Sequence, residues 1–450
     1  MKIRVIGAGL AGCEAAWQIA QAGVQVEFWE MKPQKYSPAH HSPDFAELIC
    51  SNSLKAARVD SAAGLLKEEM RRLGSLLMQC ADQCRVPAGG ALAVDRHAFS
   101  AAVTKAIREH PQIEVHSGEI TEIPTDGVNV IATGPLTSDA LAEKIAALCG
   151  GSLSFFDAAA PIVTAESLGR DRIFAASRYG KGEDDAYLNC PMNKEEYDAA
   201  PAPAFHNKTP YCTLVRVCMG GVARKANLDI DVADPKVYEG CMPIEVMAQR
   251  GPDTIRFGPL KPVGLRDPAT GHRPWAVVQL RREDREGTLY NLVGFQTNLK
   301  FGEQKRVFGL IPGLEQADFV RYGVMHRNTF LNSPKVLNSD FSLRARPDLF
   351  FAGQITGVEG YMESAASGIL AGKNALRRLQ GKETLTLPPE TMIGALSRYV
   401  QNGGEGDFQP MGANFGVMSP VVSHIRDKRS RYAAFSERSL QTLDEFLKNT

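Results

Sequence analysis

The sequence lacks the features that mark secreted, metal-binding and membrane-spanning proteins. Its nine cysteines include no C-x-x-C pair, and an odd number of cysteines cannot pair completely. We therefore expect neither a disulfide framework nor a zinc site or other metal site. No run of about 18 apolar residues occurs, which excludes a membrane-spanning helix. Unpaired thiols in this number are typical of a reducing compartment, so we expect a cytoplasmic protein.

An excess of charge of one sign is also missing. Lys and Arg total 51, as do Asp and Glu, so the formal net charge at pH 7 is zero. This balance excludes a protein coated with positive charge for nucleic acid, but it leaves room for a local basic patch. The 450 residues, 44% of them hydrophobic, are enough for two or three domains.

The start of the chain is typical of a strand–turn–helix–strand unit. Lys2–Ile6 and Val24–Trp29 have the composition of strands, and residues 14–22 have helical spacing. The turn between the first strand and the helix has the G-x-G-x-x-G pattern, and an acidic residue ends the second strand. This context predicts a dinucleotide site. Its residues are Gly7, Ala8, Gly9, Leu10, Ala11, Gly12 and Glu30.

Each glycine of this turn has a physical role in such a site. Gly7 permits the tight turn, Gly9 lets the backbone approach a pyrophosphate, and Gly12 lets the helix pack closely on the strand. The helix N-terminus attracts the phosphates. We expect Glu30 to accept hydrogen bonds from the adenosine ribose hydroxyls.

Two later elements favour FAD over NAD. Residues 129–132 predict a strand that ends in Thr133-Gly134, and residues 348–353 predict a second strand that ends in Gly353-Gln354. A helix that begins near Glu363 would direct its positive N-terminus toward a flavin ring, where reduced flavin is negatively charged. We therefore expect Gly134, Gly353 and Gln354 to contribute to a bound FAD.

The remaining pattern predicts an α/β fold, a Rossmann-like FAD-binding domain with an inserted mixed α+β domain. Helical spacing predicts one long helix over 61–84 and another over 96–110. Short β-like runs between Pro- and Gly-rich turns, such as 276–280 and 289–293, indicate the insert. We expect the first part of the FAD-binding domain at 1–157, the insert at 158–320, and the return of the FAD-binding domain with a C-terminal helical segment at 321–450.

The sequence resembles a known family, the bacterial folate- and FAD-dependent tRNA (uracil-54-C5)-methyltransferases. The resemblance extends over nearly the whole chain, except that residues 199–236 depart from the family pattern. The motifs that carry it are Val5–Gly12, Pro38–His41, Glu47–Leu54 (ELICSNSL), Val86–His97, Gly240–Met247, Phe257–Gly264, Gly294–Thr297, Gly323–Thr329 and Phe351–Tyr361.

The resemblance implies a reaction, its cofactors and its partner. Methylenetetrahydrofolate would supply a one-carbon unit to C5 of a uridine in the tRNA T-loop, and the product would be 5-methyluridine. FAD, reduced by NADPH or NADH, would supply the reducing equivalents. The resemblance also implies that Cys241 is the nucleophile and that Cys50 is its partner cysteine.

The chemistry of uracil explains why such a site needs thiols. C5 becomes nucleophilic only after a thiolate adds to C6, and a base must later remove the C5 proton. Cys50 precedes Ser51-Asn52-Ser53, whose backbone amides could stabilise a thiolate. Which cysteine is the nucleophile and which is the base stays open at this stage.

Basic and histidine residues offer further candidates. A phosphate-binding surface for RNA could include Arg281, Arg282, Lys300, Lys305, Arg306, Arg426, Lys428, Arg429 and Arg431. His40-His41 and His326-Arg327 are candidates for the folate or flavin site, although a structural role for these histidines is equally consistent with the sequence. We expect the target uridine to be extruded from the T-loop into the pocket.

Four other functions fit parts of the pattern. The same chemistry could act on ribosomal RNA, or the chain could be a related flavin- and folate-dependent modifier of the wobble uridine, although such modifiers are usually longer. It could instead be a non-catalytic FAD-containing RNA-binding protein, or an NAD(P)H oxidase. The effect of replacing Cys241 and the dependence of turnover on tRNA separate these alternatives.

Overall fold

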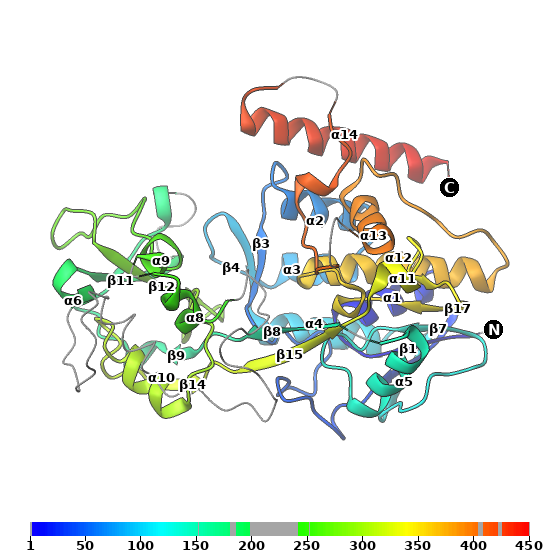
Figure 1. Cartoon of the computed structure of the whole chain (residues 1–450), viewed down its shortest axis with the longest axis horizontal. Coiled ribbons are helices and arrows are strands. Elements are labelled where there is room, and N and C mark those ends of the chain that lie inside the picture. Colours follow the sequence, from blue (N-terminus) through cyan, green and yellow to red (C-terminus); the bar gives the residue numbers. More distant parts are fainter. Residues whose placement is uncertain are drawn as a thin grey trace.

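A parallel sheet joins the two ends of the chain (Figure 1). The computed structural model describes residues 2–151, 153–180, 186–198, 242–251, 253–403, 408–421 and 425–449, without the side chains of 153–158, 198 and 325–327. Its parallel sheet has the strand order β16 (Ser342–Leu343), β17 (Arg346–Phe351), β7 (Val128–Ile131), β1 (Lys2–Ile6), β2 (Gln25–Glu30), β6 (Ile113–Ser117). All of these strands are parallel except β16, which pairs antiparallel with β17.

Helices cover this sheet and complete its core. They are α1 (Leu10–Gln21), α2 (Ala62–Arg72), α3 (Leu76–Gln83), α4 (Arg96–Arg108), α5 (Asp139–Cys149), α12 (Tyr361–Leu379), α13 (Met392–Asn402) and α14 (Lys428–Lys448). The α1 helix begins at the glycine turn and packs against α12. The buried faces of these two helices form one apolar core with the central strands. Among the described helices, none combines the length and apolar composition needed to cross a membrane.

A second, antiparallel sheet lies to the left in Figure 1 and forms the inserted part. Its order is β10 (Phe174–Ala175), β11 (Tyr187–Met192), β12 (Ala276–Arg282), β13 (Leu289–Leu292), β9 (Ile162–Thr164), β14 (Phe319–Arg321). A separate apolar core includes Phe295 and Phe308, which pack edge to face with ring centroids 5.3 Å apart. The mixed α+β character expected for this region is therefore confirmed.

Two short sheets lie between these parts. β8 (Leu153–Ala158) pairs antiparallel with β15 (Met325–Phe330), and together they carry the chain into and out of the insert. β3 (Ser53–Ala56), β5 (Ala91–Val94) and β4 (Arg85–Val86) form the other sheet. The remaining short elements are α6 (Lys194–Asp198), α8 (Ile244–Gln249), α9 (Thr254–Phe257), α10 (Phe301–Phe308), α11 (Ser333–Val336), and the 3-10 turns at 165–167, 178–180, 354–356 and 415–417.

The expectation of one long helix over 61–84 is wrong, because the chain breaks there into α2 and α3. Gly74 adopts φ 78°, in the left-handed region, and Ser75 caps the start of α3. The buried carboxylate of Glu14 accepts hydrogen bonds from the N–H groups of Leu76 and Leu77, at 3.2 and 3.0 Å. The apolar spacing continues across the break because both helices pack on the same core, so periodicity alone predicts a single helix.

A second buried carboxylate caps a helix in the same way. Glu69, from α2, accepts N–H groups of Met392 and Ile393 at the start of α13, at 2.7 and 2.9 Å, and the Ser439 hydroxyl at 2.5 Å. Burial raises the pKa of Glu14 and of Glu69 from 4.5 to about 7. Both carboxyl groups therefore bind protons more strongly in the folded chain than in the unfolded chain.

We expect the free energy of unfolding to fall as the pH rises from about 4.5 to 7 and slightly above. In this range the unfolded state holds fewer protons on these two groups than the native state, so raising the pH favours unfolding. The loss is up to about 3 kcal/mol for each carboxyl. Denaturant titrations between pH 5 and 8.5 measure it. Glu69→Gln should make the free energy of unfolding depend less on pH. The control, Glu437→Gln at an exposed site on α14, should show the same pH dependence as the parent. The same pH dependence in Glu69→Gln would contradict the raised pKa of Glu69.

Candidate active site

The glycine turn between β1 and α1 has the geometry of a phosphate-binding turn. Gly7 adopts φ 101°, and a Cβ there would lie 2.6 Å from the Ala132 carbonyl oxygen. A Cβ on Gly12 would lie 1.8 Å from the Gly7 carbonyl oxygen. At Gly9 a Cβ would meet nothing within 4 Å, and no side chain caps the helix start. The turn is therefore closed on its protein side and open on the side where a pyrophosphate would approach the α1 amides.

Glu30 lies beside this turn at the end of β2. One carboxylate oxygen accepts the Ala8 N–H at 2.7 Å, and the other accepts the Lys32 N–H at 3.0 Å. The side chain is buried, so the two amides fix its position. Each oxygen keeps a second acceptor site, and Glu30 lines a cavity of about 80 Å³ together with Gly7 and Gly9. The predicted dinucleotide residues thus meet in one place.

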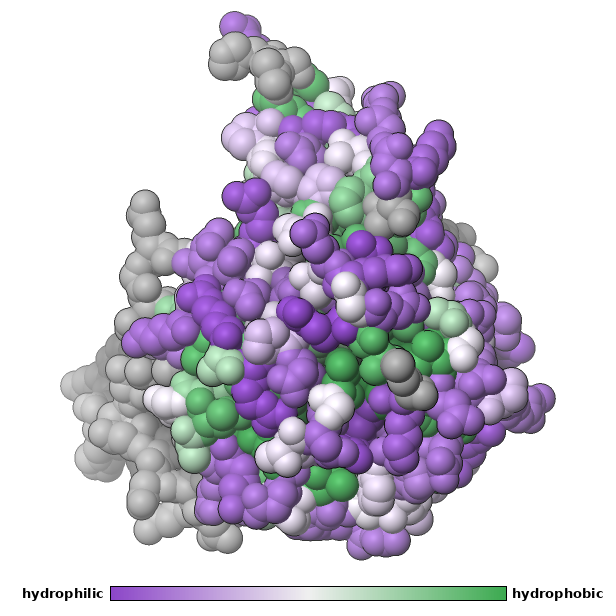
Figure 2. All heavy atoms as spheres, turned by 90° about the vertical axis from the view of Figure 1, so that its right-hand side faces the viewer, coloured by the Kyte–Doolittle hydropathy of each residue, from purple (hydrophilic) through white to green (hydrophobic). Residues whose placement is uncertain are grey.

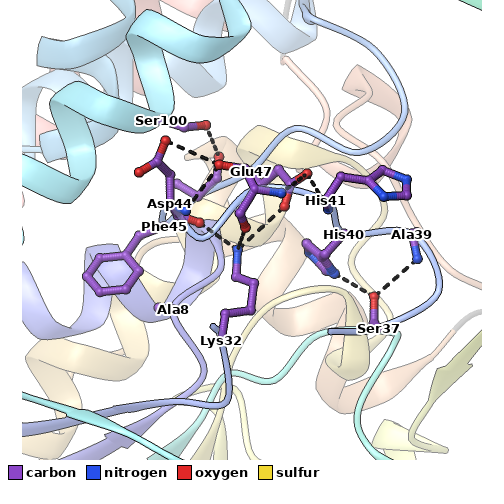
Figure 3. Close-up of polar contacts among 12 residues, drawn as sticks. Ala8, Lys32, Ser37, Ala39, His40, His41, Asp44, Phe45, Glu47 and Ser100 are labelled. Carbon is purple, nitrogen blue, oxygen red and sulfur yellow. Dashed lines mark hydrogen bonds and ion pairs between the residues drawn. The ribbon is translucent and has the colours of Figure 1, made fainter. Parts of the chain in front are cut away.

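A loop over residues 37–47 forms one wall of this cavity (Figure 3). The buried Lys32 ammonium donates to the carbonyl oxygens of Ser42 and Asp44, at 3.1 and 2.5 Å, and lies 3.5 Å from the Glu47 carboxylate. His40 also lines the cavity, with Nδ1 2.6 Å from the Ser37 hydroxyl. Lys32 therefore holds the loop against the residues that surround Glu30.

A second cavity, of about 240 Å³, contains the thiol candidate. Cys50 and Gln354 both line it, together with Tyr361 and Glu363 from the first turn of α12. The remaining lining residues are Ile49, Ser51, Ser53, Leu54, Lys55, Ala63, Leu66, Pro135, Gln296, Asn328, Glu359, Gly360 and Met362. The N-terminus of α12 faces this cavity, as expected from the sequence, and supplies positive potential to it.

The segment that carries Cys50 is held from the α12 side by one tyrosine. The Tyr361 hydroxyl oxygen accepts the N–H groups of Cys50 and Ser51, at 2.7 and 3.2 Å. Burial is the main cause that raises the pKa of Tyr361, and the adjacent Cys50 raises it further. The phenol therefore stays protonated and keeps one O–H to donate.

Three arginines hold the same segment from other elements. Arg96, on α4, donates to the Leu48 carbonyl at 2.6 Å, and Arg321, on β14, donates to the Ile49 carbonyl. Arg281, on β12, donates to the Ser51 hydroxyl at 2.7 Å and to the Asn52 side-chain oxygen at 2.8 Å. Residues 48–52 are thus fixed by groups from both the parallel sheet's helices and the inserted sheet.

Two of these arginines give the thiol a positively charged surrounding. Arg96 and Arg321 both interact electrostatically with Cys50. Burial and the charge of Arg96 lower the pKa of Arg321, but an arginine remains protonated in a protein. Cys50 therefore has two cations among its electrostatic neighbours.

Glu363 places an unsatisfied acceptor at the same cavity. Its Oε1 lies 2.7 Å from the Lys55 ammonium and accepts the Ala413 N–H at 3.0 Å. Its Oε2 is buried and has no hydrogen-bond partner among the described residues. Because a buried, unpaired acceptor is unfavourable, Oε2 fits a site where a bound ligand supplies an N–H or O–H.

The other predicted residues are distributed as follows. Gly134 and Gly353 follow β7 and β17 with φ values of 71° and 87°, and the Gly353 N–H donates to the Ser367 hydroxyl at 2.7 Å. Leu10 and Ala11 are buried in α1. Cys241 lies outside the described residues, as do the side chains of His326 and Arg327 and the atypical segment 199–236. Among the described residues, no group of three or more His, Cys, Asp or Glu side chains is placed to hold a metal ion.

One sequence interpretation is corrected here. Arg281 was a candidate for RNA phosphate contact, but its side chain is buried and binds Ser51 and Asn52. The sequence alone indicates no role for Arg96, Arg321, Tyr361 or Glu363. Arg96 lies in the motif at 86–97 and Tyr361 in the motif at 351–361, so the family resemblance could have pointed to these two residues. No motif includes Arg321.

Comparisons with known proteins agree with this architecture. The family model described as Glucose inhibited division protein A (GIDA) matches residues 2–383. A methylenetetrahydrofolate--tRNA-(uracil-5-)-methyltransferase TrmFO of Desulfitobacterium hafniense is 58% identical over 445 residues, 99% of this chain and 98% of the relative. A protein of the same name from Acetivibrio thermocellus is 56% identical over 446 residues, with the same coverage. The solved structure of Aquifex aeolicus GidA has a TM-score of 0.70 at 16% identity, covering 99% of this chain and 73% of that chain.

The parallel sheet, its glycine turn and the inserted antiparallel sheet therefore define a protein of the GIDA class, with a Rossmann-type α/β fold. More narrowly, the chain belongs to the TrmFO family of methylenetetrahydrofolate--tRNA-(uracil-5-)-methyltransferases.

Proposed function

We propose that this enzyme transfers a one-carbon unit from methylenetetrahydrofolate to C5 of the uridine at position 54 of the tRNA T-loop, forming 5-methyluridine. FAD would be its bound cofactor, and NADPH or NADH its reductant. The observation that carries the proposal is the meeting of Cys50, Gln354 and the start of α12 at one cavity, in a chain that is 58% identical to a tRNA (uracil-5-)-methyltransferase.

The two cavities fit the two ends of FAD. The turn Gly7-Ala8-Gly9-Leu10-Ala11-Gly12 would hold the pyrophosphate on the α1 amides, and Glu30 would accept the ribose hydroxyls. Gly134, Gly353 and Gln354 would lie along the flavin, and the buried Oε2 of Glu363 offers an acceptor to a bound ring. When bound, FAD supplies two-electron redox chemistry that no side chain can supply.

The chain's own residues would carry out the steps on uracil. A thiolate, assigned to Cys241, adds to C6 and makes C5 nucleophilic. After C5 has formed its bond to the one-carbon unit, Cys50 takes the C5 proton and the bond between the one-carbon unit and its carrier breaks. Two electrons and a proton, which come ultimately from NADPH or NADH, bring this carbon to the methyl level, and the thiolate leaves C6 as the 5,6 double bond returns. Arg96 and Arg321 would keep Cys50 in position through their hydrogen bonds to the preceding carbonyl oxygens.

We also propose that the two domains of the chain have different roles. Residues 1–157 and 321–450 would form the FAD-binding domain, with its C-terminal helical segment, and residues 158–320 the domain that faces the RNA. The pairing of β8 with β15 between the two larger sheets supports this division.

The test is methyl transfer to an unmodified tRNA transcript. With labelled methylenetetrahydrofolate, NADPH and the purified yellow protein, we expect label in 5-methyluridine at position 54. A transcript with cytidine at that position is the matched control. Label in ribosomal RNA alone, or at the wobble uridine, would replace the proposed substrate, and NADPH oxidation that is independent of tRNA would contradict the transferase assignment.

A further inference from the structure

The start of α14 carries a concentration of positive charge. Arg426, Lys428, Arg429 and Arg431 are all exposed, and the first turn of α14 contains no acidic residue. Cations at this end of a helix are unfavourable, because the backbone dipoles already place positive charge there. The acidic N-cap, Asp427, balances only one of these charges, and such a departure from the local rule is typical of a functional surface.

The loop at residues 58–60, which α14 contacts, carries a further cation. The Ser436 hydroxyl donates to the Val59 carbonyl at 2.7 Å, and Arg429 lies 3.4 Å from the Asp60 carboxylate. Arg58 also pairs with Asp60, at 2.9 Å. The Asp60 carboxylate thus pairs with both guanidinium groups. The side chain of Arg58 remains 54% exposed and that of Arg429 remains 79% exposed.

We call Arg58, Arg426, Lys428, Arg429 and Arg431 the basic face. The acidic residues within it are Asp60 and Asp427, and Asp427 is engaged as the cap of α14, accepting the Ser430 N–H at 2.7 Å. The chain as a whole has no net charge. The positive excess is therefore a local feature of this surface, not a property of the protein in general.

An aromatic side chain lies among these cations. The Lys428 ammonium is 5.5 Å from the centroid of the Tyr432 ring, and the Arg431 guanidinium is 5.9 Å from it. Tyr432 is half-buried against the apolar core, and its ring lies 4.6 Å from that of Phe415, measured between centroids. Cations combined with an aromatic ring are the combination by which proteins bind a nucleic-acid strand.

The basic face is linked to the Cys50 cavity by the loop that carries Arg58. Lys55 lines that cavity and is only three residues before Arg58, a span of roughly 10 Å in extended chain. Ala63 and Leu66 of α2, which line the same cavity, follow the same loop. Figure 1 shows α14 lying above α2 and β3, with its first turns directed toward the side of the inserted sheet.

From these observations we infer that the basic face binds the phosphate backbone of the RNA next to the uridine that enters the cavity. The inference rests on the proposed function, because it takes RNA as the substrate. Its phosphates would neutralise both the side-chain cations and the positive end of α14. The contact would depend strongly on salt and would be independent of base sequence.

The test is charge reversal in the first turn of α14, with Lys428→Glu and Arg431→Glu combined. These acidic residues favour the helix start, so the variant should fold. The control combines Arg378→Glu and Lys382→Glu, which are exposed near the far end of α12, about 25 Å along that helix from Tyr361. Figure 2 shows the molecule from the side to which this end of α12 points in Figure 1, and hydrophilic residues predominate there around a hydrophobic patch.

We expect the Kd for unmodified tRNA to rise at least about tenfold in the α14 variant, and the slope of log K against log salt to become shallower by about 1 to 2. The KM for tRNA should rise while kcat at saturating tRNA and the FAD content stay unchanged. The control should change these quantities little. Equal effects in both variants, or none in the α14 variant, would overturn the inference. Failure of the parent protein to bind or methylate tRNA would instead contradict the proposed function.

Discussion

Replacing Cys50 with alanine is expected to reduce methyl transfer to tRNA by about a thousandfold or more, as expected when a group that reacts or moves a proton is lost. The protein should keep its fold and its FAD, because the structural contacts of this segment are made by its backbone and by its neighbours. Tyr361 binds the Cys50 N–H, and Arg321 binds the Ile49 carbonyl. The measurement is label transfer under single-turnover conditions, with FAD absorbance as the second readout.

Cys149→Ala is the matched control, because Cys149 is a buried thiol at the end of α5, away from the cavity residues. It should leave the rate within a few-fold of the parent. If Cys50→Ala also transfers methyl at the parent rate, the assignment of Cys50 to the reaction is wrong.

A tRNA with 5-fluorouridine at position 54 separates the two cysteine roles. Fluorine at C5 cannot leave as a proton, so a thiolate that has added to C6 stays bound to the RNA. If Cys241 is the nucleophile, Cys50→Ala should still form this covalent adduct and Cys241→Ala should not. The reverse result would exchange the two roles.

Replacing Arg96 with leucine is expected to lower the free energy of unfolding by about 3 to 5 kcal/mol and to suppress methyl transfer. The Arg96 guanidinium makes two hydrogen bonds to one carboxylate oxygen of Glu283, at 3.0 and 2.7 Å, and a third to the Leu48 carbonyl. Glu283 is only 3% exposed, so the substitution leaves a buried charge without its partner. Urea titration followed by circular dichroism measures the loss.

A double variant distinguishes stability from positioning. Arg96→Leu with Glu283→Leu removes both charges, and we expect it to recover much of the stability. It should not recover methyl transfer, because the Leu48 carbonyl beside the Cys50 segment still lacks its donor. Arg71→Leu, which breaks the exposed pair with Asp82, should cost less than about 1 kcal/mol. Recovery of full activity in the double variant would contradict a positioning role for Arg96.

The fold could be predicted well wherever local pattern and tertiary packing agree. The strands β1, β2, β7 and β17 lie within a few residues of their predicted positions, because each has the apolar composition of a strand inside the sheet. The break between α2 and α3 could not be predicted. It depends on Glu14, which is distant in sequence and places its carboxylate at the new helix start.

The site residues, too, could be predicted only where a local pattern marks them. The glycine turn with Glu30 has a local spacing that carries its own physical meaning, and Cys50 and Gln354 lie in motifs of the family resemblance. Arg281 and Arg321 carry no such signal. A sequence shows that an arginine is present but not whether it faces solvent, so Arg281 was assigned to RNA although it holds the thiol segment.

The pairing of β8 with β15 has a consequence for the history and engineering of the chain. Leu153 pairs with Phe330, so the backbone leaves the nucleotide-binding part and returns to it at adjacent points, about 5 Å apart. A few residues would close that gap and leave the order of the parallel strands intact. The backbone therefore joins the two parts at a single place. A segment exchanged at that place would also have to supply the partners that Glu283, Arg281 and Arg321 provide to Arg96 and to residues 48–52.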